Sequence, residues 1–77
     1  MILIHSVLLS KMSEFGRRLR KAREDKELTQ LQLANLLNVN QITISTWERG
    51  TREPAIEMIT KIAHVLDCDV NYLFGFS

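Results

Sequence analysis

The chain has 77 residues and one cysteine, with 45% hydrophobic and 25% charged side chains and a formal net charge of +1. This length allows one domain with one small core, and the single cysteine, Cys68, excludes an internal disulfide and favours a cytoplasmic protein. The N-terminal MILIHSVLLS is too short to span a membrane and lacks a basic start and a cleavage site, so neither a membrane anchor nor a signal peptide is expected.

The charge is spread unevenly along the chain. Residues 1–27 hold seven Lys or Arg and four Asp or Glu (+3), residues 28–54 hold two of each (0), and residues 55–77 hold one and three (−2). The basic end could therefore lie near phosphates. An interpretation equally supported by charge alone is a solvated helix face. The basic side chains concerned are Arg17, Arg18, Arg20 and Lys21.

The first predicted elements are an apolar arm and a helix. The apolar side chains of residues 1–12 show no clean period of two or 3.6, so we expect an N-terminal arm that packs on the domain or on a second copy, or that is partly disordered. The domain itself is expected over residues 13–77. A helix is predicted from Ser13 to Lys26, since one apolar stripe recurs there at i, i+4 and i+7. The stripe consists of Phe15, Leu19 and Ala22.

A short second helix is predicted over Gln30–Leu37. Thr29 is a favourable N-cap, and Gln32 stands three residues later, which completes a capping box. Asn38 follows the helix. A tight turn at this point needs a residue with positive φ, which Gly adopts most easily and Asn tolerates.

A third helix is predicted over Gln41–Arg49, with Asn40 as N-cap and Gly50 ending it in the left-handed conformation. At about 100° per residue, this helix has one apolar face and one polar face that carries a single Ile. The outward positions are Gln41, Ile42, Ser45, Thr46 and Arg49. The inward positions of the span from Thr29 to Arg49, which includes both helices and the turn between them, are Leu33, Ala34, Leu37, Val39, Ile44 and Trp47.

Two further helices complete the predicted fold. The fourth covers Ala55–Leu66 with Pro54 at its entrance, and the fifth covers Val70–Phe74, capped by Asp69 and stopped by Gly75. No strand signal of comparable strength is present, so the predicted class is all-α. The apolar face of the fourth helix consists of Ile56, Ile59, Ile62, Ala63 and Leu66.

This order of elements resembles the phage-repressor and Cro-like helix-turn-helix family, often called Xre-like, over residues 14–75. The resemblance implies a compact five-helix repressor-like DNA-binding domain, with the helix-turn-helix in the second and third predicted helices. The sequence departs from the family at Asn38, Ala55 and Asp67, where Gly, Ser and Gly are usual. The motifs that match are Phe15-Gly16-Arg17-Arg18-Leu19-Arg20, Leu28-Thr29-Gln30, Leu33-Ala34, Ile44-Ser45, Trp47-Glu48-Arg49-Gly50, Arg52, Pro54, Lys61-Ile62-Ala63 and Tyr72-Leu73-Phe74-Gly75.

The resemblance also implies roles for particular residues. It places Arg23 and Glu48 in an ion pair between the first and third helices. Glutamine can pair with adenine, and Ile and Thr methyl groups can contact a thymine methyl. Trp47 is expected in the core rather than as a base-stacking platform. The expected base contacts are Gln41, Ile42, Ser45 and Thr46. The expected phosphate contacts are Gln30, Thr43, Arg49 and Arg52.

The leading hypothesis is a sequence-specific regulator of transcription, a repressor, that binds a palindromic operator in double-stranded DNA. A short domain makes few base contacts, and two copies on a palindrome supply more, so a homodimer is expected. Its interface would be the C-terminal helix, with or without the N-terminal arm. Since the chain ends just after the fifth predicted helix, we expect control by concentration, a partner protein or proteolysis rather than by a separate effector domain.

The alternative is an antitoxin-like protein-interaction module, whose adhesive surfaces would be residues 1–9 and 72–76. No cofactor is expected. His64 and Cys68 stand at i and i+4, but a structural zinc site needs four ligands, so no metal is expected. An enzyme is not expected either, since the sequence shows neither a nucleophile–base constellation nor a Gly-rich phosphate loop.

Overall fold

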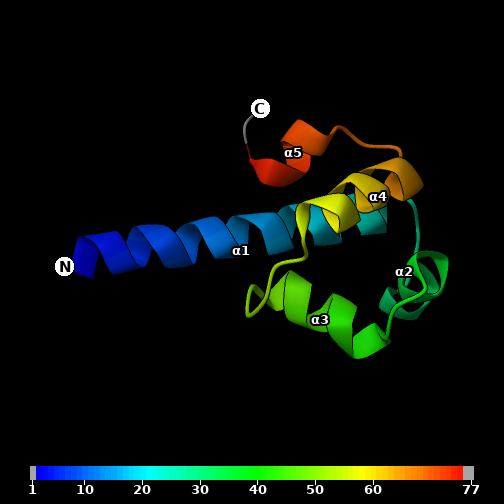
Figure 1. Cartoon of the computed structure of the whole chain (residues 1–77), viewed down its shortest axis with the longest axis horizontal. Helices are drawn as coiled ribbons and strands as arrows, with labels where there is room; N and C mark the ends of the chain where they lie inside the picture. Colours follow the sequence, from blue (N-terminus) through cyan, green and yellow to red (C-terminus); the bar gives the residue numbers. More distant parts are fainter. Residues whose placement is uncertain (1, 76–77) are drawn as a thin grey trace.

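The computed structural model describes the backbone of residues 2–75 and the side chains of residues 14–75. This part of the chain forms five helices and no strand (Figure 1). None of these helices has the length and apolar character that crossing a membrane requires. The helices are α1 (Ile2–Asp25), α2 (Gln30–Leu37), α3 (Gln41–Arg49), α4 (Ile56–Leu66) and α5 (Val70–Phe74).

The first helix differs from the prediction at both ends. It begins at Ile2 and continues through Ser13, where the sequence pattern had placed its start. Residues 2–13 contain neither Pro nor Gly, the residues that most disfavour a helix interior. An apolar stripe reports how a helix packs on its neighbours, so a helical segment without such a stripe is not predicted from periodicity. At the other end α1 stops at Asp25, before Lys26. The division into an arm (1–12) and a domain (13–77) remains a prediction.

The bounds and caps of α2 and α3 agree with the sequence prediction. The Thr29 hydroxyl accepts a hydrogen bond from the Gln32 N–H (3.0 Å), and the Thr29 N–H donates to the Gln32 side-chain oxygen (2.8 Å). Asn38 adopts the left-handed conformation with φ 57°. The Asn40 side chain then accepts from the Ile42 N–H (2.7 Å), so the second helix of the motif starts at Gln41, three residues after Asn38.

The ends of α4 and α5 follow the same rules, with one correction. Ala55 is the N-cap of α4 rather than its first helical residue, and its methyl side chain makes no cap hydrogen bond. Asp67 ends α4 with φ 51°, a conformation that Asp adopts more readily than most residues. Asp69 caps α5 through the Asn71 N–H (2.8 Å), and Gly75 ends it with φ 82°.

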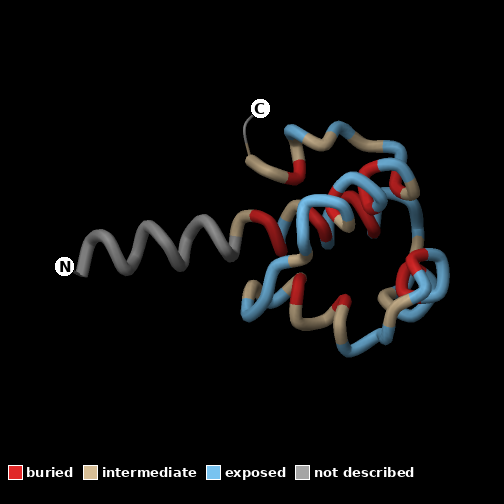
Figure 2. The backbone as a smooth tube through the Cα atoms, viewed as in Figure 1, coloured by how far each residue is buried: buried red, intermediate tan, exposed pale blue. Residues whose placement is uncertain are grey.

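The core lies where the five helices meet, and each helix contributes to it (Figure 2). Every helix contributes at least one side chain with no exposed surface; these are Leu19, Leu33, Ile44, Ile62 and Leu73. Around these pack the other buried apolar residues, which are Phe15, Ala22, Ala34, Leu37, Trp47, Ile59, Ala63 and Leu66. The prediction that Trp47 belongs to the core is confirmed, since only 7% of this residue is exposed. Helix α3 packs on α1 and α2, while α5 packs on α1 and α4.

Candidate nucleic-acid interface

The outward face of α3 is accessible over its whole length. Gln41, Ile42 and Arg49 are exposed, and Ile42 has 69% of its surface in solvent. On the opposite face Ile44 and Trp47 are buried, which holds the helix on the domain by its apolar side. The remaining expected contact residues of this face are half-buried; they are Thr43, Ser45 and Thr46.

The hydroxyl of Thr46 is already engaged within the helix. It donates to the carbonyl oxygen of Thr43, one turn earlier, at 2.7 Å. A hydroxyl has a single proton to donate. Thr46 therefore offers its methyl group and its oxygen lone pairs, not a free donor, to any molecule that meets α3.

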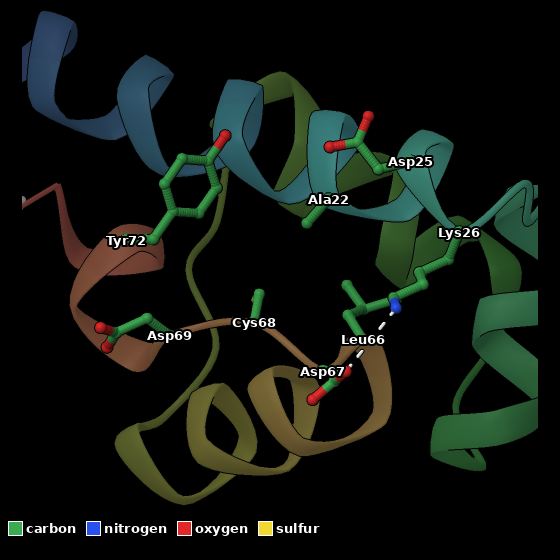
Figure 3. A pocket seen from close by; sticks show the side chains of 8 residues that line it. All are labelled: Ala22, Asp25, Lys26, Leu66, Asp67, Cys68, Asp69 and Tyr72. Carbon is green, nitrogen blue, oxygen red and sulfur yellow. Dashed lines mark ion pairs between the residues drawn. The ribbon is translucent and has the colours of Figure 1, made fainter.

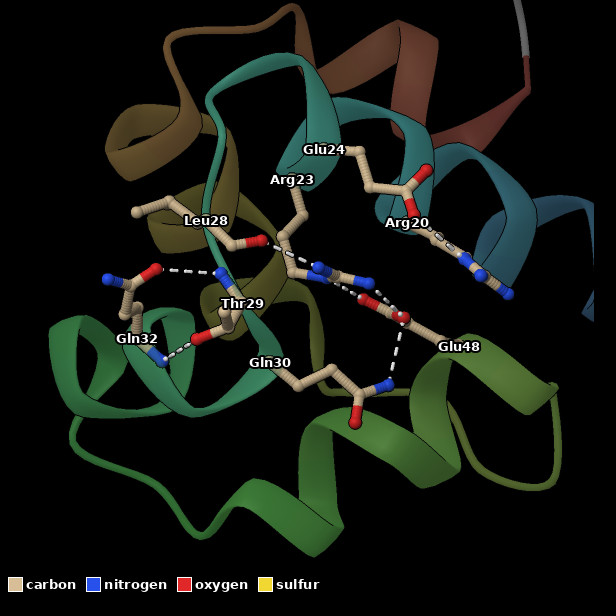
Figure 4. Close-up of polar contacts among 8 residues, drawn as sticks. All are labelled: Arg20, Arg23, Glu24, Leu28, Thr29, Gln30, Gln32 and Glu48. Atoms are coloured by element: carbon tan, nitrogen blue, oxygen red, sulfur yellow. Dashed lines mark hydrogen bonds and ion pairs between the residues drawn. The ribbon is translucent and has the colours of Figure 1, made fainter.

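A buried ion pair joins α1 to α3 (Figure 4). Arg23 contacts Glu48 through two parallel hydrogen bonds, Nε to Oε2 at 2.7 Å and Nη2 to Oε1 at 3.1 Å. The two side chains are only 9% and 4% exposed. Arg23 also donates from Nη1 to the carbonyl oxygen of Leu28 at 2.6 Å, just before α2. Hydrogen bonding to the Glu48 carboxylate raises the pKa of Arg23.

Gln30 extends this network to α2. Its Nε2 donates to Oε1 of Glu48 at 3.1 Å, so one carboxylate accepts from two helices (Figure 4). Among the described residues, no buried side-chain nitrogen or oxygen lacks a hydrogen-bond partner. This contact was missed from the sequence, because no local pattern links residues on different helices.

Gly16 explains how close α1 and α3 approach each other. A Cβ atom at this position would stand 2.6 Å from the Trp47 carbonyl oxygen and would also clash with that of Glu48. Both obstacles are backbone atoms, which cannot rotate away. The glycine inside a predicted helix was the visible signal in the sequence, because Gly lowers helix stability relative to Ala and a packing contact is one reason to keep it.

Four basic residues of α1, Arg17, Arg18, Arg20 and Lys21, pair with acids on the same helix. Each is exposed or half-buried, and this arrangement favours a solvated helix face over a phosphate-binding one. The pairs are Arg17–Glu14 (2.6 Å), Arg18–Glu14 (2.6 Å), Arg20–Glu24 (3.2 Å) and Lys21–Asp25 (3.6 Å). By contrast, the exposed Arg49 and Arg52 have no ion pair within the described residues, so positive charge is free at the C-terminal end of α3 and just beyond it.

A separate hollow of about 370 Å³ lies between α1, the end of α4 and α5 (Figure 3). Asp67 pairs with Lys26 across it at 3.8 Å. Burial, followed by the charge of Asp69, raises the pKa of the Cys68 thiol, which keeps it protonated. No group of three or more metal-ligating side chains occurs in the described part of the chain. The lining residues are Ala22, Asp25, Lys26, Leu66, Asp67, Cys68, Asp69 and Tyr72.

Comparison with known proteins agrees with this geometry. Residues 19–73 match the family model described as helix-turn-helix. The chain is 36% identical over 61 residues to the HTH-type transcriptional regulator DicA of Escherichia coli (strain K12), which covers 78% of this chain and 45% of DicA. It thus spans about half the length of the curated relatives that it matches.

Two solved structures share the fold. The restriction-modification controller protein C.AhdI of Aeromonas hydrophila superposes with a TM-score of 0.78 and 35% identity, over 84% of this chain and 98% of C.AhdI. The P22 c2 repressor, crystallised with a synthetic operator, superposes with a TM-score of 0.76 and 30% identity, over 82% of this chain and 96% of the repressor.

Proposed function

We propose that this chain, which belongs to the helix-turn-helix family, is a sequence-specific DNA-binding regulator of transcription. We propose further that it is a repressor and that it binds with α3 in the major groove. The observation that carries the proposal is the outward face of α3. Gln41 and Ile42 are exposed on this face, while the opposite face of the helix packs on the core. The P22 c2 repressor, a structural relative, was crystallised with a synthetic operator. The proposed activity is therefore DNA binding rather than catalysis. The proposed location is the cytoplasm.

The residues divide into base and phosphate contacts. Gln41 would pair with adenine through both groups of its amide, while Ile42 and the Thr46 methyl would meet thymine methyl groups. The engaged hydroxyl of Thr46 supports this apolar role. Ser45 would complete the base-reading surface. The proposed phosphate contacts, which fix the position of the domain without reading sequence, are Gln30, Thr43, Arg49 and Arg52.

A pair of substitutions tests this division. Selection from a random duplex library first yields the operator, its symmetry and its half-site spacing. On that operator Gln41→Ala should weaken binding by about 1–3 kcal/mol and relax the preference at one base pair. Arg52→Ala should weaken binding to all DNA alike and reduce the salt slope by about one. If Gln41→Ala weakens random DNA as much as the operator, Gln41 reads no base.

The proposal includes a symmetric homodimer. Two copies related by a twofold axis would hold their α3 helices about 34–36 Å apart, which matches successive major grooves. The proposed interface is α5, with or without the N-terminal arm. In α5, Val70 and Tyr72 are half-buried within one chain and retain surface for a second copy. Analytical ultracentrifugation of the full chain, free and with operator, should show a dimer, and a monomer in both conditions would contradict this interface.

A further inference from the structure

We propose that Glu48 is a positioning residue for DNA binding, which orients the Gln30 side chain toward a phosphate. This inference rests on the proposed function and adds a role that an ion pair with Arg23 does not by itself imply. The observation behind it is the hydrogen bond from Gln30 Nε2 to Glu48 Oε1 at 3.1 Å. It joins the half-buried Gln30, at the start of α2, to a side chain that is only 4% exposed.

The carboxylate determines which way the Gln30 amide faces. A glutamine amide has an oxygen end and an NH₂ end of nearly the same shape, and it can flip between them. An ionised carboxylate only accepts hydrogen bonds, so the NH₂ end must face Glu48. One of its two protons is used there. The other, in the plane of the same amide, remains to be donated to a DNA phosphate.

The carboxylate itself is held in place by two hydrogen bonds from Arg23. Arg23 binds both of its oxygens, at 2.7 and 3.1 Å. Arg23 in turn is tied to the Leu28 carbonyl oxygen at 2.6 Å, two residues before Gln30. The anchor of the amide and the start of α2 are therefore fixed by the same guanidinium. The positive charge of Arg23 also offsets the negative charge of the Glu48 carboxylate, which would otherwise repel a nearby phosphate.

The experiment is a double-mutant cycle on phosphate binding. The probe is a mixed-sequence DNA duplex of about 20 base pairs, two helical turns, at low salt, because phosphate contacts do not require the operator. The proteins are the wild type, Gln30→Ala, Glu48→Gln and the double variant, all studied where circular dichroism shows full folding. Gln32→Ala is the matched control, because its amide caps the same helix turn through Thr29 but is not proposed to touch DNA.

We expect Gln30→Ala to lower the affinity about tenfold, the fold-change of a hydrogen bond to a charged group, without changing the salt slope. Glu48→Gln should also lower the affinity, and the double variant should bind within about twofold of Gln30→Ala, since the effect of Glu48 passes through the amide. A merely structural Glu48 would give the same fold-loss with and without Gln30, and that result would overturn the proposal. Gln32→Ala should leave the affinity of the folded protein unchanged.

A second measurement decides the matter if Glu48→Gln does not fold. In the wild type, the two side-chain amide protons of Gln30 should give separate NMR signals, and addition of the same duplex should shift chiefly one of them. Equal shifts of both signals, or none, would overturn the proposed orientation. If the wild type fails to bind the duplex at low salt, the proposed function fails as well, whereas binding with an additive cycle removes only the role of Glu48.

Discussion

Helices α3 and α5 both pack against α1 but are attached to it by different means (Figure 1). At α3 the backbones touch at Gly16, and a buried ion pair crosses the interface. At α5 the polar link is Arg18, which donates to the Tyr72 carbonyl oxygen at 3.1 Å and lies 4.9 Å from the centre of the Tyr72 ring. The Arg18 side chain is 18% exposed.

The difference in solvent access sets how firmly each helix is held. A buried pair that loses one partner leaves a charge without solvent or counter-charge, whereas an accessible arginine can exchange its partner for water. We therefore expect the proposed recognition helix to be held more firmly on α1 than the proposed dimer helix. The proposed dimer helix is held by a contact that can adjust when a second copy approaches.

The largest expected effect is that of Glu48→Ala. Its removal leaves Arg23 buried without a counter-charge, and the free energy of unfolding should fall by about 3–5 kcal/mol. Urea unfolding followed by circular dichroism measures the change. Glu24→Ala is the control, because Glu24 is 54% exposed and forms its ion pair with the exposed Arg20. A loss from Glu48→Ala no larger than that of the control would remove the distinction between the two attachments.

Gly16→Ala tests the backbone contact. At a solvated helix position this change would stabilise the protein by about 0.5–1 kcal/mol. Here the added methyl meets the carbonyl oxygens of Trp47 and Glu48, so we expect a net destabilisation of about 1–3 kcal/mol as α3 moves outward. The sign of the change in the free energy of unfolding therefore tells whether the backbone contact at Gly16 is tight. A more stable variant in the same unfolding assay would show that α1 and α3 can separate without cost.

The smallest effect is expected for Arg18→Ala. Loss of the contact with the Tyr72 ring should cost about 1 kcal/mol or less. Hydrogen exchange should become faster in α5 and stay unchanged in α3, since the two helices are attached separately. Arg17→Ala is the matched control, because Arg17 shares the acid Glu14 but is 64% exposed. Equal acceleration in both helices would contradict independent attachment.

Local signals in the sequence were enough to predict most of the fold. The Thr29 capping box and the left-handed Asn38 turn arise from neighbouring residues, and the structure confirms both. The start of α1 was predicted wrongly, because residues 2–13 lack an apolar stripe although they contain neither Pro nor Gly. Periodicity predicts a helix only where that helix packs on one side.

Less of the candidate site could be predicted from the sequence alone. The outward positions of α3 follow from its helical period, and the resemblance to a known family pointed to Arg23 with Glu48. The contacts of Gln30 with Glu48 and of Arg18 with Tyr72 join residues that are 18 and 54 positions apart. Such contacts depend on how helices cross, which single-sequence patterns do not specify.

The approach of Gly16 to the Trp47 and Glu48 carbonyl oxygens also has an evolutionary consequence. The spacing of α1 and α3 is determined by main-chain atoms, which substitutions on the outward face do not alter. Mutation can thus replace Gln41 or Ser45 while the helix that carries them keeps its place. Descendants of this chain could diverge in their preferred ligands without first having to evolve a new scaffold.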